Sequence, residues 1–472
     1  MKTNPVVTFI LAAMLAGLGF IANAQQKSTI PAVHTFTAKE AVEYALKNAV
    51  QVKNALLDIK GQQQINKEIT ASAYPQISAS GSLNNNPNVG VQTFPNFIAM
   101  GTYGVLLENN VKDGNGNPIV APSDYGLISA GFGSKYSLNG GIDINQLLFD
   151  GQVFVGLMAR KSSIKSATLN AEVTKEQIKA NVYKIYYQLV VGQREIGTLD
   201  ANIANYEKLL RDIREIYKNG FAEKLDVDKV QVQLINLQTQ KLKAQNQIDA
   251  GKEGLKFLLG MPQQDQLILT DTLSDEELKL NVLDENYRYE DRKEYQQLET
   301  LLDLGKFNVK RYQLSKLPTL SLSGNYSKSA QRQQFDFFKG PYFTSSFIAL
   351  RLNAPIFDGG AKNARIAQAK IDLEKMNNNF SQLKSSIDND VAQSRITLKS
   401  ALFTMDAQKK NIDLAQQVYN STKLKYEQGL GSNQEISTAQ ADLVTAQNNY
   451  YSSLYDAVIS KIDYLKAVGK LY

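Results

Sequence analysis

The chain has 472 residues, with 52 basic and 46 acidic side chains, no cysteine and a single histidine, His34. Without cysteine no disulfide can form, and one histidine without clustered carboxylates gives no basis for a metal site, a histidine-assisted nucleophile or any cofactor. The net charge of +6, or +5 once Lys2 is removed with a leader, is too small over this length to indicate a nucleic-acid partner. We interpret His34 as an ordinary surface residue.

The first 24 residues are typical of a secretory signal. Lys2 is followed by an apolar run at 6–21 and by Ala-Asn-Ala at 22–24, which predicts cleavage before Gln25. The run is shorter than the ~20 apolar residues that a membrane span needs, so a membrane anchor is less favoured. The mature chain is therefore expected to be exported, with no cysteine after the signal to carry a lipid.

Two pairs of segments alternate strictly between apolar and small polar residues. They begin with YPQISASGSL at 74–83 and LPTLSLSGNY at 317–326, and each is followed by a second alternating segment, at 138–144 and 348–352. Period two predicts strands with one apolar and one polar face, hence four strands in two hairpins. The connection at about 84–134 is rich in Asn, Gly and Pro and is expected to be an exposed loop.

Two long helical hairpins are expected where proline is absent, at 123–261 and 356–472. Apolar or small residues recur at alternating steps of four and three over 178–217, which is the 3.5-residue period of a coiled-coil seam. The seam stops at Gly220 and then resumes, as expected of two antiparallel helices. A shift of 209 residues places Gly220 on Gly429 and yields a second, more polar hairpin, so the chain contains a duplication.

Phe-Asp-Gly occurs twice, each time between the last strand and the long helix. The residues are Phe149, Asp150 and Gly151 in the first copy and Phe357, Asp358 and Gly359 in the second. In the second copy we expect Asp358 to cap the helix, Gly359 and Gly360 to allow the change of direction and Phe357 to lie at a membrane interface. A catalytic acid is disfavoured because no base, nucleophile or metal cluster accompanies it, so we expect no enzyme.

Four strands are too few to close a membrane barrel. Sheets that span a bilayer must be closed, and known barrels begin at about eight strands. Either the strands belong to a soluble two-layer structure, or several chains pool them; three chains would give about twelve.

The duplicated order of helices, strand hairpin and long helical hairpin, the strand-ending PIFDGG and the Y-x-x-G turn resemble the TolC-like outer-membrane efflux proteins. The resemblance covers essentially the whole mature chain. It implies a mostly α fold with a small β part and a homotrimer. The trimer's 12-stranded outer-membrane β-barrel would continue into a periplasmic α-helical barrel. It implies an exit duct of a tripartite efflux or type I secretion system, working with a periplasmic adaptor and an inner-membrane transporter.

The resemblance also implies a periplasmic gate in which an acid six residues after each turn glycine faces the pore. Those positions hold Asp226 and Glu435, and Tyr426 matches a gate tyrosine. Gly431 and Thr438 depart from the family's arginine and second acid, which puts a specific latch network in doubt. A simpler alternative for the two acids is capping of the helix that each begins.

The expected segments follow from these boundaries. They are a signal at 1–24, periplasmic helices at 25–74, a first β-hairpin with its long external loop at 75–150, a first helical hairpin at 151–261, a linker with helices at 262–317, a second β-hairpin at 318–357 and a second helical hairpin at 358–472. Contacts with an adaptor are expected at 218–226 and 427–435. The alternative function is a periplasmic coiled-coil adaptor or scaffold, although an adaptor usually has a single hairpin. The sequence does not identify the cargo.

Overall fold

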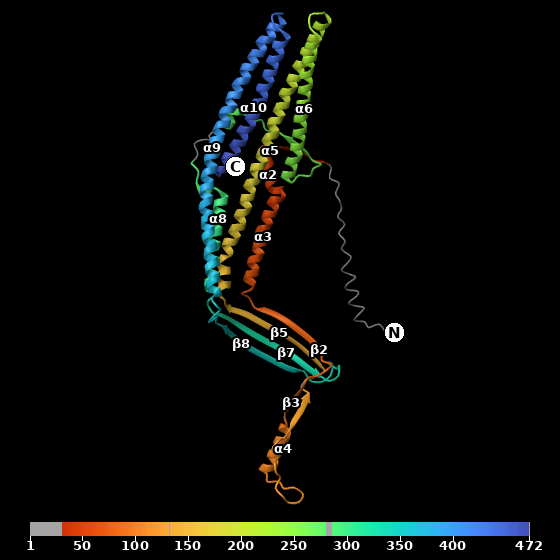
Figure 1. Ribbon diagram of the computed structural model, residues 1–472, viewed down its shortest axis with the longest axis vertical. Helices are drawn as coiled ribbons and strands as arrows, with labels where there is room; N and C mark the ends of the chain where they lie inside the picture. The colour runs from red at the N-terminus through yellow and green to blue at the C-terminus, as the bar shows by residue number, and fades with distance from the viewer. Residues whose placement is uncertain (1–30, 132, 280–285, 472) are drawn as a thin grey trace, which may run out of the picture. The chain divides into compact units, whose positions relative to one another are not determined.

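The computed structural model describes residues 31–131, 133–279 and 286–471 (Figure 1). The expected signal at 1–24 lies outside the described residues. The chain divides into two compact units, each built from segments of both halves of the sequence. We call them the helical unit (up to Ala55, 171–293 and 385–472) and the sheet unit (56–170 and 294–384).

The elements in chain order are β1 (Val33–Phe36), α2 (Ala38–Asn48), α3 (Val50–Ala71), β2 (Gln76–Asn85), β3 (Val91–Pro95), α4 (Phe97–Glu108), β4 (Leu127–Gly131), β5 (Tyr136–Phe149), α5 (Gly151–Lys218), α6 (Lys224–Leu259), β6 (Gln266–Leu269), α7 (Asp275–Lys279), the 3-10 turn η1 (Tyr289–Asp291), α8 (Lys293–Leu314), β7 (Thr319–Arg332), β8 (Phe343–Asn353), α9 (Ala361–Glu427) and α10 (Asn433–Ala467). The fold is mostly helical with a small strand portion, as expected. None of the helices in the described ranges has an apolar stretch long enough to cross a membrane.

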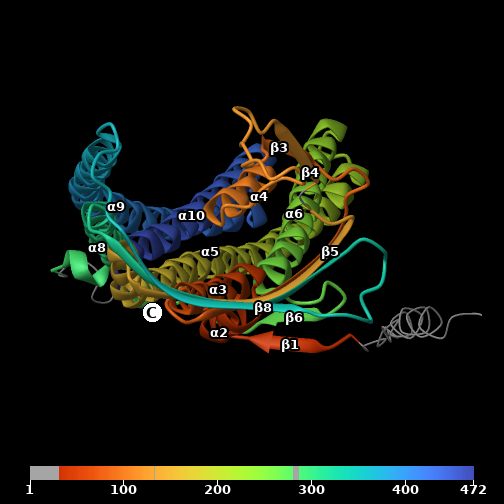
Figure 2. The same ribbon diagram turned by 90° about the horizontal axis from the view of Figure 1, so that it is seen from below.

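The four predicted strands form one antiparallel sheet in the order β2-β5-β7-β8 (Figure 1), and Figure 2 shows the curvature of β5 and β8. Ile77 lies opposite Ile144, and Leu322 lies opposite Leu350. Cross-strand partners share a face of a sheet, so most aliphatic residues of the four strands lie on one side and most Ser and Asn residues on the other. Phe343 and Phe347 of β8 are exceptions, because they pair with Ser329 and Asn325 on the polar side. The strands β2 and β8 form the two edges.

The connection at 84–134 is not a plain loop, which corrects that expectation. It contains the paired strands β3 and β4 and the helix α4. The Asn96 side chain accepts a hydrogen bond from the Ala99 N–H at 3.0 Å and so caps α4. The apolar residues of α4 have no helical period, and none is buried, which is why the sequence pattern did not reveal it.

A second unpredicted feature is the parallel pair of β1 and β6, whose partners are 233 residues apart. The His34 Nε2 atom lies 3.1 Å from Asp265 Oδ2, and the Ala32 N–H donates to Asp265 Oδ1 at 3.1 Å. The histidine side chain is 26% exposed. The only histidine is therefore a partly buried residue of β1 that contacts Asp265, just before β6, rather than an ordinary surface residue.

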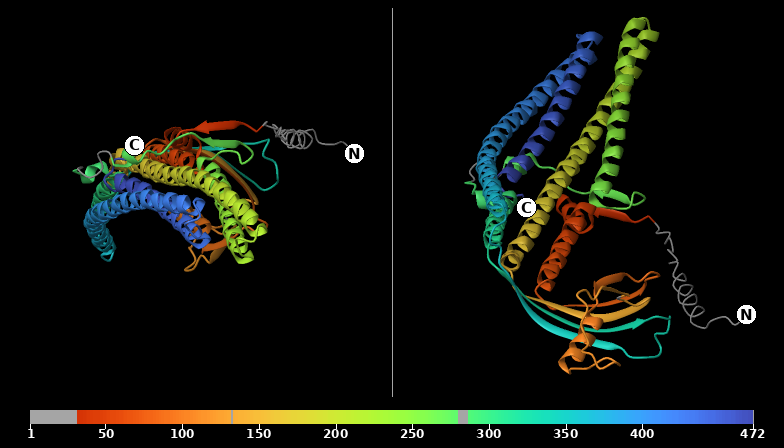
Figure 3. Two further views of the ribbon diagram at one scale, coloured as in Figure 1. Left: turned by 90° about the horizontal axis from the view of Figure 1, so that it is seen from above. Right: turned by 60° about the horizontal axis from the view of Figure 1, so that its bottom comes forward.

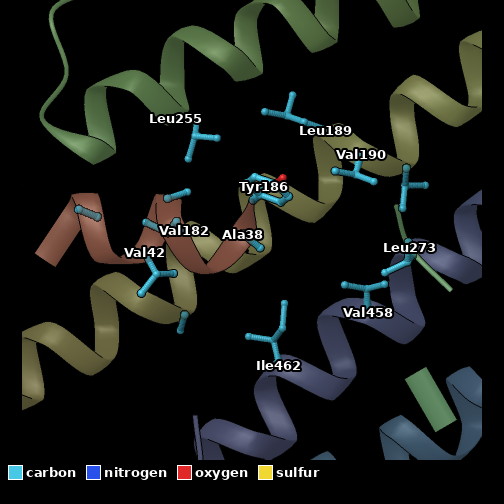
Figure 4. Packing of buried hydrophobic residues seen from close by; sticks show 14 of the residues in the cluster. Ala38, Val42, Val182, Tyr186, Leu189, Val190, Leu255, Leu273, Val458 and Ile462 are labelled. Carbon is cyan, nitrogen blue, oxygen red and sulfur yellow. The ribbon is translucent and has the colours of Figure 1, made fainter. Parts of the chain in front are cut away.

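The core of the helical unit lies along the predicted seam. Seam residues buried on α5 are Ile178, Val182, Leu189, Leu199, Tyr206, Leu210 and Ile213, and those on α10 are Ile436, Leu443 and Tyr450. Figure 4 shows how α2, α5, α6 and α10 contribute side chains to one cluster that includes Ala38, Tyr186, Leu255 and Val458. Within this unit the segments of α5, α6, α9 and α10 lie side by side in one curved layer (Figure 3).

The second helix of each hairpin is followed by a glycine that packs closely against the backbone of another segment. Gly260 has φ +70°, and a Cβ there would lie 2.5 Å from the Asn48 carbonyl oxygen. Gly469 has φ +74°, and a Cβ there would lie 2.8 Å from the Asp291 carbonyl oxygen. Both positions need glycine for its left-handed backbone and for its missing side chain.

Candidate functional site

The two helical hairpins end in turns that place an acid at the same position of the following helix. Asp226 is the third residue of α6, and its Oδ2 accepts a hydrogen bond from the Glu223 N–H at 3.3 Å. Glu435 is the third residue of α10, and its Oε2 accepts from the Ser432 N–H at 3.3 Å. Both carboxylates cap their helices, which is the simpler of the two interpretations and does not exclude the other.

Tyr426 connects the second hairpin to the first. Its ring packs against the buried cluster near the ends of the hairpins. Burial raises the pKa of the Tyr426 hydroxyl, and the negative charges of Asp212 and Asp226 raise it further. The structure therefore brings Tyr426 close to Asp226. The charges that raise this pKa are those of Asp212 and Asp226, and Glu435 is not among them.

A groove of about 460 Å³ lies between the first turns of α6 and α10. Lys229 of α6 donates through Nζ to Gln434 Oε1 of α10 at 3.2 Å, and Gln434 Nε2 donates to Thr438 Oγ1 at 3.3 Å. Thr438 thus lines the groove where the family pattern has an acid. Lys229 was missed by the sequence reasoning because nothing in its spacing distinguishes it from other exposed lysines.

Gly431 has a local reason to lack a side chain. A Cβ there would lie 3.1 Å from the backbone nitrogen of Tyr426 and 3.3 Å from the carbonyl carbon of Lys425. The arginine that the family pattern has at this position would crowd this turn. The departure from the family pattern therefore fits the shape of the second turn.

The two Phe-Asp-Gly junctions cap their helices in similar ways. Asp150 Oδ1 accepts from the Gln152 N–H at 2.7 Å, and Asp358 Oδ2 accepts from the Lys362 N–H at 2.9 Å. Gly359 has φ +66°, as expected of a residue that redirects the chain. Gly151 instead needs to be small, because a Cβ there would lie 2.6 Å from the Leu314 carbonyl oxygen.

The two phenylalanines of these junctions differ in exposure. The Phe149 ring is half-buried, with its centroid 5.6 Å from that of Phe154. The Phe357 side chain is 89% exposed. A free aromatic ring is available only in the second copy.

An acid in the linker between the two halves fixes that linker to the second hairpin. Asp275 accepts from Lys409 Nζ at 2.6 Å and from the Tyr450 hydroxyl at 3.0 Å. Burial acts to raise the pKa of Asp275, but these two hydrogen bonds outweigh it and hold that pKa below its ordinary value. Within the described ranges no group of acids and His34 could hold a metal ion.

The comparisons with known proteins agree with this architecture. The family model of the outer membrane efflux protein matches residues 41–261 and 291–470. The outer membrane protein TolC of Vibrio cholerae is 20% identical over 349 residues, which cover 71% of this chain and 77% of TolC. The probable efflux pump outer membrane protein TtgC of Pseudomonas putida is 22% identical over 354 residues, covering 72% of this chain and 70% of TtgC.

Solved structures share the fold. The structure of CusC superposes with a TM-score of 0.72 at 16% identity and covers 91% of each chain. The Campylobacter jejuni CmeC outer membrane channel superposes with a TM-score of 0.71 at 16% identity, covering 92% of this chain and 86% of CmeC. With the family model matching most of its length in both halves, this chain belongs to the outer membrane efflux protein family.

Proposed function

We propose that this outer-membrane efflux channel is a homotrimer whose three four-stranded sheets close into one 12-stranded barrel. The observation that supports it is a sheet with one apolar face and two unpaired edges, β2 and β8. An open edge inside a bilayer leaves backbone N–H and C=O groups without partners, which costs several kcal/mol per group. Pairing β8 of one copy with β2 of the next removes every edge when three copies close the ring.

The exposure of the sheet supports a lipid-facing side. Ile77 is 68% exposed, Ile348 is 83% exposed and Leu350 is 65% exposed, all on the same face. On the opposite face Asn325 Nδ2 donates to Asp143 Oδ1 at 2.8 Å. Apolar side chains toward lipid and polar side chains toward an aqueous lumen are the pattern of a transmembrane barrel. Phe357, beyond β8, is placed to act as an interfacial anchor.

The periplasmic end of the duct is proposed to be gated at the hairpin ends by Asp226, Glu435 and Tyr426. Three copies of each acid around a narrow opening repel one another and attract cations. Several buried polar atoms in the first turns of α10 make no hydrogen bond. They belong to the side chains of Asn433, Ser437 and Gln440, which have no partner for these atoms in the described chain. Buried polar atoms without partners destabilise the packed arrangement, which favours a hairpin end that can move.

The hairpin ends are also the proposed contacts for the periplasmic adaptor that joins the channel to its pump. Phe221 follows Gly220 and is 85% exposed, and Leu430 follows Gly429 and is 78% exposed. Each hairpin therefore presents one apolar side chain at an equivalent place in its turn. A partner with small apolar pockets would bury both. The alternative of a periplasmic adaptor is not favoured, because the family comparison and the amphipathic sheet both fit a channel.

The gate is tested by removing its charges while keeping its helix caps. We expect Asp226→Asn combined with Glu435→Gln to lower the cation preference of single channels in planar bilayers, since the amide oxygens still accept the capping N–H groups but carry no charge. The reversal potential in a salt gradient measures this preference. Asp228→Asn, two residues from Asp226 on the same helix, is the control and is expected to change it less. An unchanged reversal potential in the double variant would mean that neither acid contributes to the cation preference, which would contradict their proposed role in the gate.

A further inference from the structure

A cavity of about 270 Å³ in the helical unit combines a carboxylate with apolar and aromatic walls. It lies between α5, α6 and α10, well away in sequence from the hairpin ends. The apolar wall is made by Ile185, Leu189, Val191, Ala244 and Ile248. Glu195 of α5 supplies the only carboxylate among its lining residues, and α10 supplies Tyr451 and Tyr455.

Glu195 has no hydrogen bond or ion pair within the described chain, although its side chain is half-buried. Burial raises the pKa of this carboxyl group. No lysine or arginine is among the described residues that line the cavity. Arg194, the next residue back along α5, donates to the Leu273 carbonyl oxygen at 3.0 Å, and Lys241 of α6 pairs with Asp200 at 2.5 Å. The carboxylate therefore lines the cavity without a protein cation to neutralise it.

Close packing fixes the shape of the cavity before any ligand arrives. A Cβ at Gly192 would lie 3.2 Å from Ile248 Cγ1, and one at Gly251 would lie 2.7 Å from Leu189 Cδ2, so α5 and α6 touch at these glycines. The Tyr451 hydroxyl lies 2.5 Å from Thr198 Oγ1, which fixes one aromatic wall. Figure 4 shows Leu189 in the core that backs this region. A pre-formed cavity saves the cost of ordering its walls on binding.

We propose that this cavity binds a small organic ammonium ion with an apolar body. The ammonium would pair with the Glu195 carboxylate and lie against the tyrosine rings, whose faces attract cations. The apolar body would occupy the Leu189 and Ile248 side. A partly buried carboxylate without a partner is disfavoured, and an ammonium ligand supplies the missing charge. Gln188, Gln247 and Asn448 add polar side-chain amides to the lining of the cavity.

Protonation of Glu195 is expected to release the ligand. The raised pKa of this carboxyl places its proton uptake at higher pH than for an ordinary glutamate. The other residues with ionisable side chains that line the cavity are Tyr451 and Tyr455, so Glu195 is the only carboxyl group among its described lining residues. Binding is thus expected to weaken as the pH falls through the pKa of this one group.

The proposal is tested by equilibrium dialysis of benzyltrimethylammonium against the full-length protein in detergent. Saturable binding is expected, and Glu195→Gln is expected to weaken it by about tenfold or more. Glu207→Gln removes one charge from an exposed position of the same helix and is the matched control, expected to bind as the wild type. Ala244→Leu fills the cavity without changing charge and is expected to abolish binding.

Two results would overturn the proposal: no saturable binding by the wild type, or equal binding by the wild type and Glu195→Gln. The thermal midpoint of Glu195→Gln checks folding, and it is not expected to fall because the replaced carboxylate has no partner to lose. The measurement does not depend on trimer formation, gating or export, so its failure would leave the proposed function intact, and failure of the gate experiment would leave this one intact.

Discussion

Ile348→Lys is expected to destabilise the membrane-inserted channel by about 2 to 4 kcal/mol, which is the cost of a lysine at the lipid-facing middle of a barrel strand. Ile348 is 83% exposed, is the sixth of the eleven residues of β8 and lies on the apolar face opposite Gly324. Urea unfolding of the channel reconstituted in lipid vesicles measures this change in free energy.

Ala349→Lys is the control for this prediction. Ala349 is the next residue along β8, lies opposite Ser323 and shares its face with the charged side chain of Arg351. A lysine there would point toward water in the proposed barrel, so little loss of stability is expected. Equal destabilisation by both substitutions, or a larger loss from Ala349→Lys, would contradict the assignment of the two faces.

Gly260→Ala and Gly469→Ala are each expected to destabilise the helical unit by about 2 to 5 kcal/mol. Left-handed backbone costs a residue with a Cβ roughly 1 to 2 kcal/mol, and an added methyl in a packed site costs about 1 to 3 kcal/mol more. The added Cβ would lie 2.5 Å from the Asn48 carbonyl oxygen in the first case and 2.8 Å from that of Asp291 in the second. Neither neighbour is a flexible side chain that could move aside. Thermal unfolding followed by the circular dichroism of the helices measures the loss.

Gly220→Ala and Gly429→Ala separate the two contributions. Both glycines have a positive φ, +80° and +77°, yet a Cβ at either would meet nothing within 4 Å. Only the backbone term of roughly 1 to 2 kcal/mol applies to them. If the four substitutions lower the unfolding temperature equally, the backbone contacts of Gly260 and Gly469 are not what makes glycine necessary there.

Periodic patterns of apolar residues predicted the strands and the long helices correctly. Alternation at Ile77 and Leu350 identified strands and the faces they share, and the 3.5-residue spacing through Val182 and Leu443 identified buried helix stripes. The duplication helped, because each pattern occurs twice. These features follow from residues near one another in sequence, and the structure confirms them.

Contacts between distant segments were not predictable in the same way. Asp275 meets Tyr450 across 175 residues, and His34 meets Asp265 across 231, with no local pattern to pair them. Gly151 and Gly359 occupy matching motif positions, but one is needed for close approach and the other for its backbone conformation. The shared motif therefore shows that glycine is needed at both positions, but it does not show which of the two reasons applies at each.

In the candidate gate, too, the local features could be predicted and the contacts between distant segments could not. The spacing from Gly220 and Gly429 located the two acids, and the structure places both at the third position of a helix. The spacing did not indicate that the charge of Asp226 would act on the Tyr426 hydroxyl, nor that Lys229 would bond to Gln434. Those contacts depend on how the two hairpins pack, which no single hairpin sequence specifies.

This chain is an outer-membrane efflux channel that extends into the periplasm, and we propose that it works with a periplasmic adaptor and a pump. We propose that three chains combine their strands in one barrel, because a sheet with free edges at β2 and β8 cannot lie alone in a bilayer. Native mass spectrometry of the channel extracted from the outer membrane tests this most directly. The account predicts a species with three copies of the chain, and a single copy as the main species would contradict it.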